Sequence, residues 1–190
     1  SHGERVKLSR PLDWLVVTDH SDAMGAMNEI VAGNPDLMRE PMLKDWHDRI
    51  KAGGDTALGA TMEVIETFAG ISGEKLPAIV QSDEFVSSVW GRYLEAAEEY
   101  NEPGRFSTII GYEWTSTPGG NNLHRNVLYR DGAAEARRML PYTTAASFNP
   151  EDLWTWMETY EEKTGGRLLA LAHNGNVSNG LMFPEVNPET

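Results

Sequence analysis

The chain contains no cysteine, which excludes disulfides, thiolate zinc sites, iron–sulfur clusters and cysteine nucleophiles. It is also poor in positive charge, because 16 Lys and Arg stand against 29 Asp and Glu and give a formal net charge of −13. A protein this acidic repels phosphate backbones, so we expect no nucleic-acid partner. A small anionic substrate still agrees with this charge where a metal ion inverts the local field.

Long hydrophobic runs are also missing. No stretch approaches the ~18 apolar residues that a membrane span needs, and the run Leu168–Ala172 is the size of a strand. With 190 residues, 40% of them hydrophobic, the chain can build one core, so we expect a single soluble domain over residues 1–190. Because the chain begins at Ser1 and residues 184–190 are turn-like, we expect this domain to be incomplete at both ends.

Apolar and β-branched runs alternate with helical patterns along the chain. The patterns predict strands over 12–18, 106–112, 126–130 and 167–172, and helices over 38–50, 57–68, 85–100 and 149–163. Ser82 and Asn149 are the expected caps of the last two helices. This order favours an α/β fold with parallel pairing and a first strand buried on both faces, while 106–130 could instead hold a hairpin.

Histidines and acids gather where the expected strands begin or end. Asp19 and His20 follow the first strand, Glu113 the second and His173 the fourth, and His124 precedes the third. In parallel α/β folds the carboxyl ends of the strands converge on one mouth, and His124, which follows a Gly-rich loop, can reach the same place. Imidazole and carboxylate ligands without thiolate suit Zn²⁺, Mn²⁺ or Fe²⁺, so the joint pattern predicts a metal site.

Each of these residues also has a structural interpretation. A single strand-terminal His is commonly a cap, and Glu113 could be one buried carboxylate with a structural partner. We interpret His47 as a solvated helix residue and His2 as a mobile terminal one. The combination of three histidines and one glutamate at strand ends, in a chain with five histidines, favours the metal site.

Short motifs carry a family resemblance. Thr18-Asp19-His20, Gly111-Tyr112-Glu113, Leu123-His124 and Ala172-His173 resemble the PHP (polymerase and histidinol phosphatase) superfamily. The longer strings 10–15, 111–116, 118–126 and 173–176 resemble a bacterial family called domain of unknown function 3604, and the resemblance is weakest over 22–80 and 131–148. It implies a partial, distorted (β/α)7-type barrel with two or three metal ions at the strand ends.

The resemblance also implies roles for individual residues. Glu113 matches a carboxylate that bridges two metals, His124 and His173 match further ligands of one metal, and His20 matches a ligand of its neighbour. Asp19 matches a motif residue that ligates or orients. The superfamily's His-x-His motif on the first strand and its closing Asp-x-His motif are both absent, and Asn174 stands where Pro is usual. The chain thus holds one fairly complete metal position and part of the others.

The expected activity is metal-dependent hydrolysis of a small anionic substrate, a phosphoester first, by metal-activated water. Asp19 would position that water or accept its proton, and Arg125 would stabilise phosphate charge. Asn174, Asn176 and Trp114 are the expected substrate contacts.

Two alternatives stay open, namely hydrolysis of a non-phosphate ester or amide bond and a non-catalytic metal-binding domain. A barrel cut short would leave open sheet edges, so self-association is a further expectation. The residues do not assign a compartment, and both bacterial cytoplasm and periplasm remain open.

Overall fold

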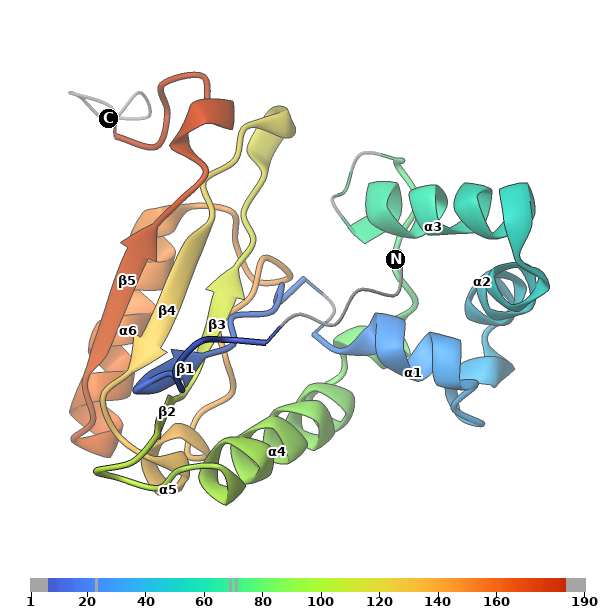
Figure 1. Ribbon diagram of the computed structural model, residues 1–190. Coiled ribbons are helices and arrows are strands. Elements are labelled where there is room, and N and C mark those ends of the chain that lie inside the picture. The colour runs from blue at the N-terminus through green and yellow to red at the C-terminus, as the bar shows by residue number, and fades with distance from the viewer. Residues whose placement is uncertain (1–6, 23, 69, 71, 184–190) are drawn as a thin grey trace.

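A computed structural model describes residues 7–22, 24–68, 70 and 72–183 (Figure 1). The expectations for His2, Ser1 and residues 184–190 lie outside the described residues. The first half of the chain is mostly helical and contains β1 (Trp14–Val16), α1 (Ala26–Ala32), η1 (Leu37–Arg39), α2 (Pro41–Ala52), α3 (Gly54–Phe68), η2 (Ala78–Gln81) and α4 (Asp83–Glu99). The second half contains β2 (Ser107–Ile109), β3 (Gly111–Trp114), η3 (Pro118–Gly120), β4 (Arg125–Tyr129), α5 (Ala133–Ala136), α6 (Pro150–Thr164), β5 (Leu168–Ala172) and η4 (Gly175–Val177).

The five strands form two small sheets, so the expectation of a partial (β/α)7-type barrel is wrong. β1 pairs with β2 in parallel, whereas β3, β4 and β5 form an antiparallel sheet in that order. The connection from β3 to β4, residues 115–124, is shorter than the roughly dozen residues that a parallel crossover needs. The hairpin over 106–130, the alternative left open by the sequence, therefore describes this region.

The single strand expected over 106–112 is split between the two sheets. Its first part, β2, follows β1, and its second part, β3, follows β4. The residues after β1 nevertheless stay in register with the residues after β2. Val16 pairs with Ile109, and four positions further on His20 forms a parallel bridge with Glu113. At the interruption the Tyr93 hydroxyl donates to the Val17 carbonyl and accepts from the Gly111 amide, both at 3.0 Å.

Gly111 has to be a glycine at this point. A Cβ there would lie 2.8 Å from Val16 Cγ2 and 2.9 Å from Leu128 Cδ2, closer than side chains pack. The close approach explains the first residue of the Gly-Tyr-Glu string in structural terms. The missing side chain lets β3 lie close to Val16 of β1 and Leu128 of β4, two residues before Glu113.

Tyr93→Phe should therefore destabilise the chain more than loss of an exposed hydroxyl. The change leaves the Gly111 amide and the Val17 carbonyl without their shared partner, and because Gly111 is buried, its unsatisfied amide costs about 1–3 kcal/mol. Urea unfolding measures the difference, with Tyr100→Phe, at the exposed end of α4, as the matched control. Equal stability of the two variants would contradict the bridging role of Tyr93.

Helices cover one face of the antiparallel sheet. Tyr112 and Trp114 of β3 and Val127 and Tyr129 of β4 are buried in one core together with residues of α4 and α6, namely Trp90, Leu94, Leu153 and Tyr160. Burial of each such large apolar side chain contributes about 1.5–3 kcal/mol. Because side chains alternate along a strand, Glu113 lies on the opposite face.

The first strand is not buried on both faces as the sequence analysis expected. Trp14 is 58% exposed, and Leu15 and Val17 are exposed as well. β1 pairs with β2 alone among the described residues, and no helix covers its side chains there. Its apolar composition is thus typical of an interior strand, while its position in the described part of the chain is an edge.

Helices α1, α2 and α3 pack around a second core, seen on the right in Figure 1. Ile30, Leu43, Trp46 and Val64 are buried there, and Phe85 at the start of α4 packs against them. Since Trp90 and Leu94 lie in the first core, α4 joins the two. His47 is not a solvated residue as expected, because it is half-buried and its Nδ1 lies 2.7 Å from the Ile30 carbonyl at the end of α1.

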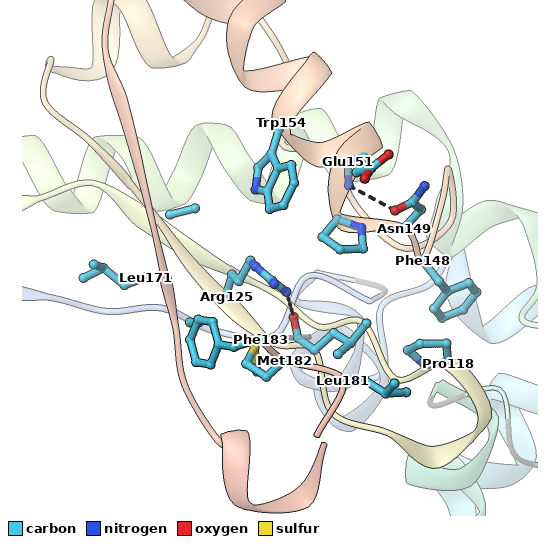
Figure 2. A pocket seen from close by; sticks show the side chains of 14 residues that line it. Pro118, Arg125, Phe148, Asn149, Glu151, Trp154, Leu171, Leu181, Met182 and Phe183 are labelled. Carbon is cyan, nitrogen blue, oxygen red and sulfur yellow. Dashed lines mark hydrogen bonds between the residues drawn. The ribbon is translucent and has the colours of Figure 1, made fainter. Parts of the chain in front are cut away.

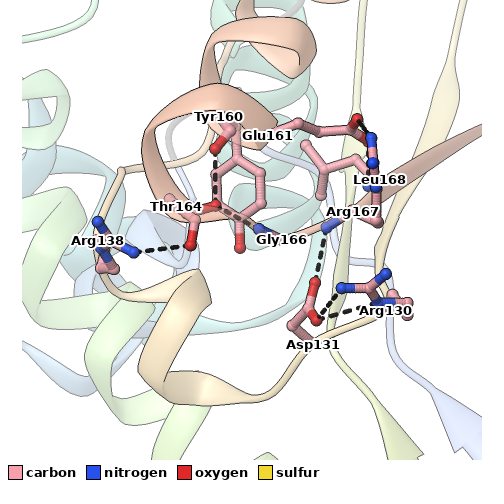
Figure 3. A network of polar contacts seen from close by, with 9 residues as sticks. All are labelled: Arg130, Asp131, Arg138, Tyr160, Glu161, Thr164, Gly166, Arg167 and Leu168. Atoms are coloured by element: carbon pink, nitrogen blue, oxygen red, sulfur yellow. Dashed lines mark hydrogen bonds and ion pairs between the residues drawn. The ribbon is translucent and has the colours of Figure 1, made fainter.

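A polar network fixes the junction between α6 and β5 (Figure 3). Asp131 pairs with Arg130 and accepts from the Arg167 amide at 2.7 Å, and Glu161 accepts from the Leu168 amide at 3.0 Å. These bonds hold the start of β5 in register against β4. A slip of one residue would turn every β5 side chain to the other face, so the network also sets the direction of His173 beyond the strand's end.

Candidate metal centre

Three adjacent antiparallel segments bring Glu113, His124 and His173 together. Glu113 lies near the end of β3, His124 directly before β4, and His173 directly after β5. Because β4 runs against both neighbours, its beginning lies beside their ends, and the His173 amide donates to the His124 carbonyl at 3.2 Å. We expected the same gathering from parallel strands, whereas the three residues meet at one edge of an antiparallel sheet.

The central carboxylate is held by its own backbone as well. The Glu113 amide donates to the Asp19 carbonyl at 2.9 Å, and the Glu113 carbonyl accepts from the Ser21 amide at 3.0 Å. On the other side Glu113 pairs with Asn126 of β4. Glu113 therefore has a neighbour on each side, which fixes the direction of its side chain.

One oxygen of Glu113 faces two imidazoles. Its Oε1 lies 2.7 Å from Nδ1 of His124 and 3.1 Å from Nε2 of His173. Glu113 is 5% exposed and His124 6% exposed, so water reaches this cluster poorly. The three ligand atoms lie within 4.8 Å of one another, which is close enough to share one metal ion.

The hydrogen bonds around this cluster fit a cation. Nε2 of His124 lies 2.9 Å from the Thr117 hydroxyl, while Nδ1 of His124 lies against Oε1 of Glu113 and has no other polar partner among the described residues. When Nε2 donates its proton to Thr117, Nδ1 carries a lone pair that faces a carboxylate oxygen. Two acceptors at this separation repel each other, and a divalent ion between them removes that cost.

The second oxygen of Glu113 faces His20. Its Oε2 lies 3.4 Å from Nε2 of His20, whose Nδ1 lies 3.7 Å from Oδ1 of Asp22. His20 is largely exposed, so it stands at the rim of the cluster rather than inside it. The carboxylate of Glu113 thus has one oxygen directed to the buried histidines and one to the rim.

Local charges shift the pKa of two of these groups. Burial raises the pKa of Glu113, but the contact with His124 and the nearby charges of His20, His124 and His173 outweigh it, so the pKa lies below its ordinary value. Asp22 raises the pKa of His20 through a side-chain interaction, against desolvation. The carboxylate is therefore in the charged form that metal binding requires.

A cavity of about 710 Å³ adjoins the cluster. Asp19, His20 and His124 line its polar side, and Val64, Ile65 and Phe68 of α3 line its apolar side. Asp19 is exposed at this cavity. The volume and the mixed lining are typical of a site for a small molecule.

Four expected site residues lie apart from the cluster. Arg125 is buried and lines a different cavity, and Trp114, its partner in the β3–β4 register, is fully buried in the helix-covered core. Both side chains point to the face opposite Glu113. Asn174 and Asn176 are exposed after β5, where Asn174 has a φ of 57° and precedes η4.

Two contacts of the cluster were missed from sequence. Thr117, whose hydroxyl lies 2.9 Å from Nε2 of His124, lies in a loop seven positions earlier, and no spacing rule connects a loop hydroxyl with a histidine that far away. Asp22 follows His20 by two positions, and a carboxylate beside a candidate histidine could have been noted as its partner.

Comparisons with known proteins identify the family of the chain. No curated protein and no solved structure matches the chain. One family model, described as "Protein of unknown function (DUF3604)", matches residues 1–190. In the part of the chain that the structure describes, no helix has the length and apolar character of a membrane span. The match covers the whole chain and confirms the narrower resemblance of the motifs: the chain belongs to the DUF3604 family.

Proposed function

We propose that the chain is a metal-dependent hydrolase whose divalent ion is held by Glu113, His124 and His173. The observation that carries the proposal is the 2.7 Å distance between Oε1 of the buried Glu113 and Nδ1 of His124. The other ring nitrogen of His124, Nε2, lies 2.9 Å from the Thr117 hydroxyl. Histidine and carboxylate ligands fit Zn²⁺, Mn²⁺ and Fe²⁺. Such an ion supplies Lewis-acid chemistry and lowers the pKa of bound water toward about 7.

Support for a second ion comes from the other side of Glu113. Its Oε2 is directed to His20, and the imidazole of His20 is in turn beside Asp22. A carboxylate whose two oxygens face different ligand groups can bridge two metal ions, which is the role that the resemblance to PHP proteins implies for Glu113. His20 is therefore proposed as the protein ligand of the second ion.

Other residues of the chain would act on the substrate and the incoming water. Asp19 faces the cavity and would hold the water or accept its proton. The apolar side chains of α3, which line the side of the cavity opposite these polar residues, would limit the entry of bulk water. A small phosphoester is the substrate class that the PHP resemblance favours, and a non-phosphate ester is the second candidate because the ligand set serves both.

A substrate panel tests this function. We expect p-nitrophenyl phosphate to be hydrolysed when Zn²⁺, Mn²⁺ or Fe²⁺ is supplied, and His124→Ala to lower the rate at least about a hundredfold because it removes one ligand of the ion. His47→Ala is the matched control, since His47 lies in the helical core and outside the cluster.

The panel also separates the alternatives. Turnover of p-nitrophenyl acetate with none of the phosphate would favour the non-phosphate ester. Bound metal without turnover of any ester or amide would favour a non-catalytic metal-binding domain. Turnover that survives His124→Ala would contradict the proposed centre.

A further inference from the structure

A second cavity lies away from the metal centre (Figure 2). Its volume is about 780 Å³, which is in the range of small-molecule sites. Its apolar walls include several of the large side chains that are exposed to solvent: Phe148, Trp154, Leu181 and Phe183. Exposed apolar side chains gathered around one hollow indicate an occupant with an apolar body.

A single buried cation lies among these side chains. Arg125 is 6% exposed, and Figure 2 shows its guanidinium between Trp154 and Phe183. It donates one hydrogen bond, from Nη1 to the Leu123 carbonyl at 2.5 Å, and its Cζ lies 5.9 Å from the centre of the Trp114 ring. The carbonyl and the ring orient the guanidinium plane and leave most of its N–H donors available.

No carboxylate forms an ion pair with Arg125 anywhere in the described ranges of the chain. This is unusual for a buried charge, because an uncompensated buried ion costs several kcal/mol. Glu113, the other buried Asp, Glu, Lys or Arg among the described residues, lies on the opposite face of the sheet. A ligand that complements both the unpaired guanidinium and the apolar walls has one acidic end and an apolar body.

We propose that this cavity binds a small organic monocarboxylate, with the carboxylate on Arg125 and an aromatic or branched apolar body between Trp154, Phe148 and Phe183. The planar guanidinium matches a carboxylate through two parallel hydrogen bonds. A dianion such as a phosphate monoester fits less well, because the cavity holds one cation, Glu151 also lines it, and the chain carries a net charge of −13.

Fluorescence and calorimetric titration with 2-naphthoate, compared with the neutral 2-naphthalenemethanol, test the site. We expect the carboxylate to bind with a Kd below about 1 mM and the alcohol at least about tenfold more weakly. Arg125→Gln should weaken naphthoate binding at least about tenfold and leave binding of the alcohol unchanged, and Arg125→Lys should fall between. Arg105→Gln, at an exposed site outside the cavity, is the matched control.

Two results would overturn the proposal: equal binding of the acid and the alcohol, or naphthoate binding that survives Arg125→Gln. Because removal of a buried Arg can prevent folding, the site is also mapped on the unaltered chain by NMR. We expect naphthoate to shift the indole N–H of Trp154 and the guanidinium of Arg125, and shifts confined to other residues would contradict the site. The readout is binding without metal or turnover, so its failure leaves the metal centre untouched.

Discussion

Replacing Glu113 by Gln is expected to abolish the stabilisation of the chain by divalent metal. In the unaltered chain a metal at a hundred times its Kd stabilises the folded state by about 2.7 kcal/mol. For a chain of this size that corresponds to a rise in Tm of about 5–10 °C. The amide of Gln keeps the shape but removes the negative charge between His124 and His173, so the rise in Tm should disappear.

Differential scanning calorimetry with and without Zn²⁺ or Mn²⁺ gives this comparison directly. Glu102→Gln is the matched control, because Glu102 is exposed and pairs with Arg105 far from the cluster. Its metal-dependent rise should equal that of the unaltered chain. A rise of full size in Glu113→Gln would show that the metal binds elsewhere, and the site would have to be reassigned.

Thr117→Val is expected to weaken metal binding about 10- to 100-fold, although Thr117 does not touch the ion. The Thr117 hydroxyl lies 2.9 Å from Nε2 of His124, and when it accepts the Nε2 proton it keeps the lone pair on Nδ1, the atom that faces Glu113. Valine has nearly the same shape but offers no acceptor, so the proton is free to move to Nδ1, where it competes with the metal. Competition titration with a chromophoric chelator measures the change in Kd.

The serine variant separates the hydroxyl from the packing. Thr117→Ser keeps the hydroxyl and should restore most of the affinity, whereas a packing effect would not be rescued. Thr155→Val serves as a control, because Thr155 bonds only within the exposed surface of α6. Equal affinity of Thr117→Val and the unaltered chain would mean that the tautomer of His124 is set by another group.

The sequence predicted the site better than the fold. Glu113, His124 and His173 were singled out because they stand at strand ends, and they meet in the structure. Glu113 and His173 stand at the ends of their strands and His124 at the beginning of its strand, and in an antiparallel sheet the beginning of the middle strand lies beside the ends of its neighbours. The caps Ser82 and Asn149 were also confirmed, since each accepts a backbone hydrogen bond at the start of its helix.

Local sequence patterns could not decide whether the predicted strands form a barrel or two separate sheets. Residues 106–112 were predicted as one strand, yet the pairing partner changes at Ile110, and that change depends on contacts with β1 and β4 that lie far away in sequence. Alternation along β4 was the signal that would have separated His124 from Arg125, because neighbouring residues on a strand face opposite sides. Their adjacency in sequence suggested a shared site, whereas the structure places Arg125 at a different cavity.

The metal content of the purified chain tests the proposed centre most directly. Elemental analysis after loading with Zn²⁺, Mn²⁺ or Fe²⁺ should find one or more equivalents in the unaltered chain and in His47→Ala. His124→Ala should retain less than about a tenth of that amount, because it removes one of the three ligands that share an ion. No metal in the unaltered chain after loading, or full retention in His124→Ala, would contradict a metal centre built on Glu113, His124 and His173.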